Sequence, residues 1–191
     1  MPKTQYLTAT SVDGFIADQD NSLDWLFAAE ASSADGMDEI GTGFSAFFEQ
    51  IGAIAMGATT YEWVLAHEQL LAEPHKWPYG EVPCWVFSHR KLPQVPGARI
   101  SFVSGNVRPV HEEMTAAAGE RNRWLIGGGD LAGQFADHGL LNEIILSIAP
   151  ALLGAGAPLL PRRLMPDELS LTECRQVGNF VQLTYAIGRH G

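Results

Sequence analysis

Hydrophobic and polar positions follow two periods along this chain, and each period predicts a kind of element. Short apolar runs and alternation at every second position predict strands, whereas apolar residues spaced three and four apart predict helices. Strands are expected at residues 4–10, 53–57, 84–88, 99–103, 123–126 and 142–150. Helices are expected at residues 44–52, 59–69, 107–120 and 131–139. Because strands and helices alternate, the pattern predicts an α/β domain with a mostly parallel central sheet.

The pattern changes towards the C-terminus. Residues 152–161 read as an irregular loop, and residues 168–188 as two strands joined at Gly178-Asn179. Strands joined by so short a turn pair in antiparallel fashion. The sequence therefore predicts one three-layer α/β domain over residues 1–191, whose sheet carries antiparallel strands at its C-terminal end.

One predicted helix has an apolar face, and another ends at a glycine that can form its C-terminal cap. Phe44, Phe47, Phe48 and Ile51 have helical spacing and are expected to lie on one face of the first helix. Gly139 follows the last helix, where a glycine favours the left-handed C-terminal cap.

The net charge of the chain limits the kinds of partner that it can bind. The chain has 12 Lys and Arg residues against 22 Asp and Glu residues, which gives a net charge of -10. A nucleic-acid surface needs a basic stripe, so no nucleic-acid partner is expected. An anionic ligand would have to be held by local cations and backbone N–H groups. The hydrophobic fraction of 46% is sufficient for a sizeable core.

The cysteines, the N-terminus and the histidines exclude several classes of protein. Cys84 and Cys174 are expected to be buried free thiols rather than a disulfide scaffold or a zinc site. The N-terminus lacks a signal-peptide core, and no apolar run approaches the roughly 20 residues of a membrane span. A cytoplasmic protein without a membrane partner is expected. His67, His75 and His111 have no clustered third ligand, so no metal site is expected.

Three consecutive glycines, Gly127 to Gly129, stand between an apolar strand and a helix. Ligands bind at the carboxyl ends of strands in open α/β sheets, and the N-terminus of the following helix attracts anions. Because glycine has a high entropic cost on folding, a run of three needs a reason. The run predicts a ligand, most naturally a phosphate, that approaches the backbone too closely for a Cβ atom.

A second glycine pattern competes with the first. Residues 41–46, GTGFSA, satisfy a loose G-x-G-x-x-A dinucleotide signature. A true signature follows a strand, whereas the preceding residues here are acidic and without pattern. We interpret the segment as a loop and the start of a helix. The chain has neither a P-loop motif nor a G-x-S-x-G elbow.

Five segments, in order, resemble the dihydrofolate-reductase-like superfamily. They are TATSVDGFIAD, MGATTYE, VFSHRKL, WLIGGGDLAGQF and PALLGAGAPLL, and they extend over nearly the whole chain. The resemblance is closest to stand-alone proteins similar to the reductase domain of riboflavin biosynthesis, the C-terminal domain of the bifunctional deaminase-reductase. It implies a dihydrofolate-reductase-like fold and NADPH as cofactor. Because the riboflavin-type relatives tend to dimerise, a homodimer is one of the oligomeric states open to this chain.

The resemblance also implies the residues that hold NADPH. Those near its phosphates are Gly57, Thr59, Thr60, Gly127, Gly128, Gly129, Asp130 and Leu131. Those near its adenosine ribose and 2′-phosphate are Ser88, His89 and Arg90, and those flanking its nicotinamide are Ala9, Ile16 and Ala17. A cis peptide is implied at Gly127-Gly128. The family commonly has an arginine where this chain has Ala58, so Arg90, with Lys91, is the nearby replacement.

On the substrate side, the resemblance places Asp13 in a loop over the nicotinamide and Trp25 beside the substrate pocket. Asp13 can cap backbone N–H groups of that loop. The proton donor is expected to be solvent, Asp13, Asp24 or Glu30, although Asp24 and Glu30 can also be charges on a helix face. An acid in an apolar pocket would need a raised pKa to donate near neutrality.

These features lead to a hypothesis and two alternatives. The main hypothesis is an NADPH-dependent reductase that transfers a hydride to a small heterocyclic or sugar-linked substrate. It would resemble 5-amino-6-(5-phosphoribosylamino)uracil reductase or dihydrofolate reductase. The first alternative is an NADPH-binding protein without turnover, a sensor or degenerate paralogue, and the second is a flavin-dependent reductase. The apolar run 144–153 can belong to a dimer interface or to a core strand, and the core is favoured.

Overall fold

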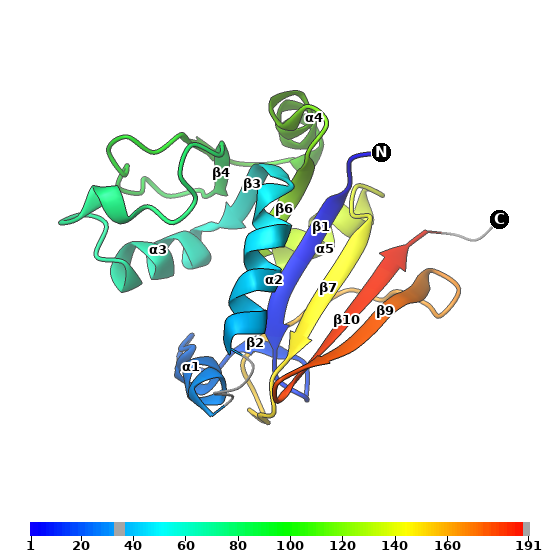
Figure 1. The fold of residues 1–191 in the computed structure, drawn as a ribbon. Helices are drawn as coiled ribbons and strands as arrows, with labels where there is room; N and C mark the ends of the chain where they lie inside the picture. Colours follow the sequence, from blue (N-terminus) through cyan, green and yellow to red (C-terminus); the bar gives the residue numbers. More distant parts are fainter. Residues whose placement is uncertain (33–36, 189–191) are drawn as a thin grey trace.

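An eight-stranded sheet forms the centre of the protein (Figure 1), with the strand order β5-β4-β3-β6-β1-β7-β10-β9. The computed structural model describes residues 1–32 and 37–188 and, for residues 37–42, the backbone alone. In sheet order, the strands are Ile100–Val103 (β5), Cys84–Phe87 (β4), Ile51–Gly57 (β3), Asn122–Gly127 (β6), Thr4–Thr10 (β1), Glu143–Ile148 (β7), Phe180–Ile187 (β10) and Leu169–Val177 (β9).

The direction of the strands confirms the predicted sheet. The neighbours from β5 to β7 all pair in parallel, whereas β10 pairs antiparallel with both β7 and β9. The turn between β9 and β10 lies at the predicted Gly178-Asn179, and Gly178 has a positive φ of 57°. Since β1, β3, β4 and β6 are parallel, their carboxyl ends meet at one edge of the sheet.

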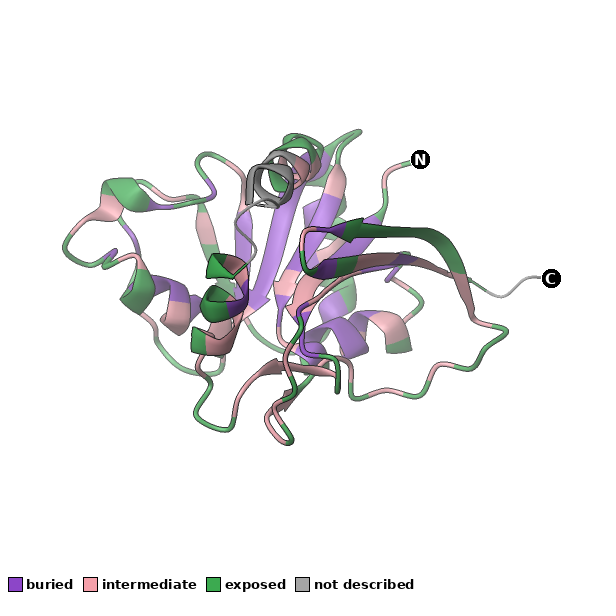
Figure 2. Ribbon diagram, turned by 60° about the horizontal axis from the view of Figure 1, so that its bottom comes forward, coloured by how far each residue is buried: buried purple, intermediate pink, exposed green. Residues whose placement is uncertain are grey.

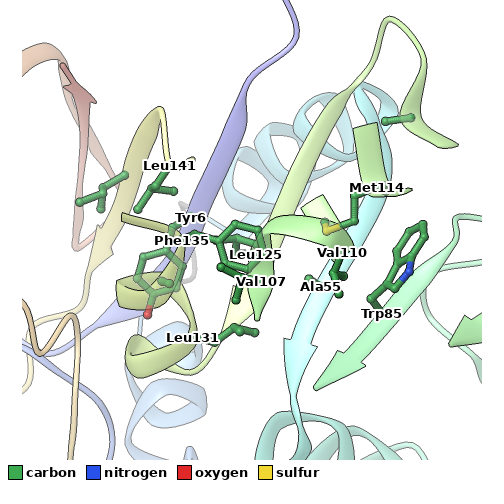
Figure 3. Close-up of a cluster of buried hydrophobic side chains, with 14 residues drawn as sticks. Tyr6, Ala55, Trp85, Val107, Val110, Met114, Leu125, Leu131, Phe135 and Leu141 are labelled. Carbon is green, nitrogen blue, oxygen red and sulfur yellow. The ribbon is translucent and has the colours of Figure 1, made fainter. Parts of the chain in front are cut away.

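Helices cover both faces of this sheet, which confirms the three layers. The helices are Asp24–Ala31 (α1), Met37–Glu49 (α2), Ala58–His67 (α3), Val107–Ala118 (α4) and Gly129–Asp137 (α5), with a short 3-10 turn at Pro74–Lys76. Side chains of α4 and α5 form one buried cluster with Tyr6, Ala55 and Leu125 (Figure 3). Side chains of α2 and α3 form a second cluster with Ile54 and Met56. Successive residues of β3 thus face opposite layers.

Burial is greatest in the central strands and least in β9 at the edge (Figure 2). Ile144, Ile145 and Ala149 are buried, which agrees with the preference for a core strand there. Cys84 is buried as predicted, but the prediction of burial for Cys174 is wrong, because it lies on the exposed edge strand β9.

The first predicted helix needs a correction at its end. Phe44, Phe47 and Phe48 of α2 contact Trp124 of the sheet, with ring centroids 5.5–6.4 Å apart, so that face is confirmed. Ile51 is not on the helix but is the first residue of β3, fully buried and paired with Asn122. The GTGFSA segment lies inside α2, so it is not a phosphate-binding loop.

At the carboxyl edge of the sheet lie two small elements that were not predicted. They are α1 and a two-stranded ribbon of Phe15–Ala17 (β2) with Ala157–Pro158 (β8). The ribbon joins the loop after β1 to the loop after β7. Among the described helices, none is long and apolar enough to cross a membrane.

Candidate functional site

Two adjoining cavities lie at the carboxyl edge of the parallel strands. The inner cavity has a volume of about 390 Å³ and lies among β1, β6, α3 and the β2–β8 ribbon. The outer cavity has a volume of about 340 Å³ and lies among the ends of β3 and β4, α3 and α5. Both are lined by Thr59, Thr60, Gly128 and Asp130, which form a shared wall. Together the cavities outline one elongated site.

Most of the predicted cofactor residues come together here. The inner cavity is lined by Ile16, Ala17, Thr59, Thr60, Gly127, Gly128, Gly129 and Asp130. The outer cavity is lined by Gly57, Thr59, Thr60, Ser88, His89, Gly128, Asp130 and Leu131. Of the predicted cofactor set, Ala9 and Arg90 line neither cavity.

Two helices begin at the shared wall. Gly57 is the N-cap of α3 and Gly128 is the N-cap of α5, and neither provides a side-chain cap. The first N–H groups of a helix have no partner within the helix, and they carry partial positive charge. The wall can therefore bind an anion through the backbone of two helices, without a lysine or arginine.

Each of the three consecutive glycines is required for a different structural reason. A Cβ atom on Gly127 would lie 2.9 Å from Oγ1 of Thr60, and one on Gly129 would collide with the carbonyl oxygens of Pro158 and Leu159. Gly128 has a φ of 86°, a left-handed conformation that turns the chain from β6 into α5. The predicted cis peptide at Gly127-Gly128 is wrong, because the peptide is trans and the positive φ makes the turn. Two of the three glycines therefore serve packing within the protein rather than the approach of a ligand.

Gly57 differs from these glycines. Its φ is an ordinary -81°, and a Cβ atom there would have no protein atom within 4 Å. Since Gly57 lines the outer cavity, a side chain at this position would occupy space within the site. A ligand close to the backbone accounts for this glycine better than any packing requirement.

Arg90 is turned towards α3 rather than into the outer cavity. Its two Nη atoms donate to the two carboxylate oxygens of Glu62, at 2.9 and 2.8 Å. Its backbone N–H donates to Oγ of Ser88 at 2.9 Å. Both members of the ion pair are exposed. Exposed pairs of this kind contribute little free energy, about 0–1 kcal/mol, so Arg90 can exchange Glu62 for another anion at small cost.

Asp13 ties two loops together. Its carboxylate accepts hydrogen bonds from Oγ of Ser11 at 2.6 Å, from the N–H of Gly154 at 2.7 Å and from the N–H of Leu153 at 3.1 Å. The Ser11 hydroxyl, followed by these two N–H groups, holds the pKa of Asp13 below its ordinary value. An ionised carboxylate is a poor proton donor near neutrality. Asp13 does cap N–H groups, as the sequence suggested, but they belong to the loop after β7.

The other predicted substrate residues lie outside both cavities. Asp24 is exposed in the first turn of α1. Glu30 is half-buried, and desolvation raises the pKa of its carboxyl group. Trp25 packs against a small buried cluster that contains Phe180. The structure brings none of these three side chains to the cavity walls, and their predicted roles stay predictions.

The inner cavity contains functional candidates that the sequence analysis missed. Thr8, Trp63 and Tyr79 all line it. Thr8 is one residue from the predicted Ala9, and Trp63 lies one helical turn after Thr59, so periodicity could have indicated both. Tyr79 had no such signal, because it comes from an irregular segment and reaches the site by packing against Trp124. Burial raises the pKa of the Tyr79 hydroxyl, which therefore stays protonated.

Replacement of Asp13 by asparagine is expected to make the protein less stable at neutral pH but not at low pH. The folded-state pKa lies below the unfolded value of 3.8, so the carboxylate stabilises the fold above about pH 4. This stabilisation is lost as the pH falls through the folded pKa. Thermal unfolding of both proteins from pH 7 to pH 2.5 should show a Tm difference that closes below pH 4. A Tm difference that stays constant with pH would contradict this role.

No group of three or more metal-binding side chains occurs in residues 1–32 and 43–188, the part whose side chains the structure describes.

Comparisons with known proteins agree with this arrangement. A model of the RibD C-terminal domain family matches residues 2–183. The uncharacterized protein YwjB of Bacillus subtilis (strain 168) is 30% identical over 183 residues, which cover 96% of this chain and 97% of that protein.

Solved structures also share the fold. The structure of a protein assigned to riboflavin biosynthesis in Shewanella sp. PV-4 has 26% identity and a TM-score of 0.78, covering 98% of this chain and 99% of its own. The diaminohydroxyphosphoribosylaminopyrimidine deaminase/5-amino-6-(5-phosphoribosylamino)uracil reductase of Thermotoga maritima has 14% identity and a TM-score of 0.64, covering 98% of this chain and 57% of its own. This second likeness shows the fold alone. The predicted dihydrofolate-reductase-like fold is confirmed, and the chain belongs to the RibD C-terminal domain family.

Proposed function

We propose that this protein is an NADPH-dependent reductase that transfers a hydride to a small ring substrate in the inner cavity. The observation that carries the proposal is the pair of cavities joined at a wall where α3 and α5 begin. An extended dinucleotide has the matching shape, with a pyrophosphate between two ring systems. A reductase of the riboflavin pathway kind is the activity that the family supports.

The residues present fit such a cofactor. Gly57 leaves space for a phosphate against the start of α3, and Thr59 and Thr60 line both cavities beside it. The outer cavity, with Ser88 and His89, would hold the adenosine end, and the inner cavity, with Ile16 and Ala17, the nicotinamide. When bound, NADPH supplies the hydride.

The protein's own contribution is alignment and exclusion of water. The apolar inner cavity would hold the two reacting rings against each other and keep solvent away from the transferred hydride. Since Asp13, Asp24 and Glu30 do not line it, the proton is proposed to come from water. The protonated hydroxyl of Tyr79 can donate a hydrogen bond to an oxygen or nitrogen that gains negative charge.

Titration with NADPH and NADH, followed by quenching of tryptophan fluorescence, tests the proposal. Trp63 lines the inner cavity and provides the signal. We expect NADPH to bind more tightly than NADH, and we expect Arg90→Ala to reduce NADPH affinity about tenfold with little effect on NADH, because one charge-assisted contact is lost. Lys76→Ala, which removes the same charge from an exposed ion pair with Glu73 outside both cavities, is the matched control. Failure of both nucleotides to bind would contradict the proposal.

The alternative of NADPH binding without turnover is favoured by one observation, the absence of the three predicted acids from the lining of the inner cavity. In that case NADPH would bind but would not be oxidised in the presence of pteridine, aminouracil or quinonoid substrates. Following NADPH absorbance at 340 nm after the binding titration separates the two functions.

A further inference from the structure

The inner cavity is mostly apolar. Among the residues whose side chains the structure describes, none that lines it is a lysine or arginine, and Asp130 is the one acidic residue on its wall. Most of its wall is apolar, from Ile16, Leu23, Trp63 and Ile126 among others. A ligand group that enters this cavity exchanges water for hydrocarbon surface.

The elements before residue 76 contribute no cation to the cavity. Residues 4–75 contain no lysine or arginine, although they contain twelve acidic residues. This stretch provides β1, β2 and α3, which form much of the cavity. The electrostatic potential from this side of the site therefore opposes an anionic substrate.

Arg162 and Arg90 come from segments that border the site, but both donate to carboxylates and neither lines the inner cavity. Arg162, next to the lining residue Pro161, donates to Asp130 at 3.0 Å and to Asp137 at 2.7 Å. Arg90 is held by Glu62. Away from the helix starts at the shared wall, where the proposed pyrophosphate would lie, a buried phosphate in the inner cavity would thus lack a counter-charge, which is unfavourable.

A stack of aromatic rings that ends at the inner cavity favours a planar ligand there. The ring of Trp63 lies parallel to that of His67, with centroids 4.5 Å apart, and His67 lies parallel to Phe27 at 5.3 Å. Trp63 is the member of this stack that lines the inner cavity. A planar conjugated ring would extend the stack, and offset stacking of this kind is favourable.

We propose that the substrate is a planar, uncharged conjugated ring that carries neither phosphate nor carboxylate. The proposal rests on the proposed function in taking the inner cavity as the place of hydride transfer. The ring gains a hydride from the reduced nicotinamide and a proton from water. The carbon of a C=O or C=N bond takes the hydride and its oxygen or nitrogen takes the proton, which gives CH–OH or CH–NH, and the nicotinamide is oxidised. A quinone reduced in this way tautomerises to the hydroquinone. Quinones and unphosphorylated pterin-type heterocycles share this chemistry, whereas 5-phosphoribosyl compounds do not.

Two matched pairs of rings test the proposal by isothermal titration calorimetry on the NADP⁺-saturated protein and on the protein alone. One pair is 6-methylpterin and pterin-6-carboxylate, and the other is 1,4-naphthoquinone and its 2-sulfonate. All measurements use Cys174→Ser, because the exposed thiol of Cys174 would add to a quinone. We expect the neutral member of at least one pair to bind about tenfold or more tightly than its anion, and the responding pair identifies the ring type.

A second variant, Leu23→Arg, is designed to gain affinity for the anionic ring of each pair. Leu23 lines the inner cavity, so an arginine there should raise the affinity for the anionic member about tenfold, the effect of one charge-assisted hydrogen bond. Leu171→Arg on the exposed strand β9 changes the net charge equally and should leave the affinity unchanged. If Leu23→Arg does not fold, the comparison of neutral and anionic rings on the Cys174→Ser protein still decides.

Equal or tighter binding of the anion in both pairs, or binding of neither neutral ring, would overturn the inference. So would NADPH oxidation that occurs with 5-amino-6-(5-phosphoribosylamino)uracil and with no neutral ring, while the proposed reductase function would survive. Conversely, if neutral rings bind but NADPH does not, the inner cavity does prefer neutral rings, and the proposed reductase function is wrong.

Discussion

Gly129→Ala is expected to destabilise the protein by about 3 kcal/mol, the upper end of the usual cost of forcing an extra carbon into a packed site. The new Cβ atom would collide with the carbonyl oxygens of Pro158 and Leu159, and the carbonyl carbon of Leu159 would be 2.8 Å away. These are backbone atoms that cannot rotate out of the way. For a domain of this size, the expected fall in Tm is roughly 6–12 °C, measured by differential scanning calorimetry.

Gly188→Ala is the matched control for this substitution. A Cβ atom on Gly188 would have no protein atom within 4 Å, and its φ is not positive. The control should change the free energy of unfolding by less than about 0.5 kcal/mol, as surface substitutions usually do. A Gly129→Ala protein as stable as the control would show that the loop at residues 157–162 does not pack on α5 as described.

Gly57→Ala is expected to have the opposite profile, with unchanged stability and weakened NADPH binding. The added methyl group meets no protein atom, but it enters the outer cavity between the start of α3 and the proposed phosphate. Loss of one charge-assisted hydrogen bond costs about 1.5–3 kcal/mol, or about 10- to 100-fold in affinity. Fluorescence titration gives the affinity, and calorimetry checks that Tm stays the same.

NADH provides the internal control for Gly57→Ala. Both nucleotides carry the pyrophosphate, so their affinities should fall by the same factor, whereas Arg90→Ala should affect NADPH alone. If Gly57→Ala binds NADPH as tightly as the unaltered protein, the phosphate does not lie against Gly57 and the proposed cofactor position is wrong.

The sequence predicted the layers of the fold better than the ends of its elements. The bounds of β1 are those expected, because a β-branched and aromatic run stops at the Asp13-Gly14 turn. Ile51 was predicted on the helix because its spacing from Phe47 and Phe48 is helical. An apolar residue at this position fits a buried strand equally well, and the pairing with Asn122 shows that it begins β3. Helix α1 has no clear apolar stripe, so periodicity could not reveal it.

At the site, sequence reasoning located the residues but not their contacts. The segments with Gly57, Ser88 and Gly127 to Gly129 converge as expected, since each follows a parallel strand. The partner of Arg90 was not visible, because Glu62 lies 28 residues earlier on another element. Likewise, the collision that requires glycine at position 129 involves Pro158 and Leu159, which a local pattern cannot bring into view.

The central position of β1 has a consequence for the order of events during synthesis. Its two neighbours in the sheet are β6 and β7, which begin at Asn122 and Glu143. At 5–20 residues per second, the ribosome needs roughly ten seconds after making β1 to deliver them. During that interval both edges of β1 lack their native partners, so we expect the nascent chain to be a chaperone client until β7 has emerged.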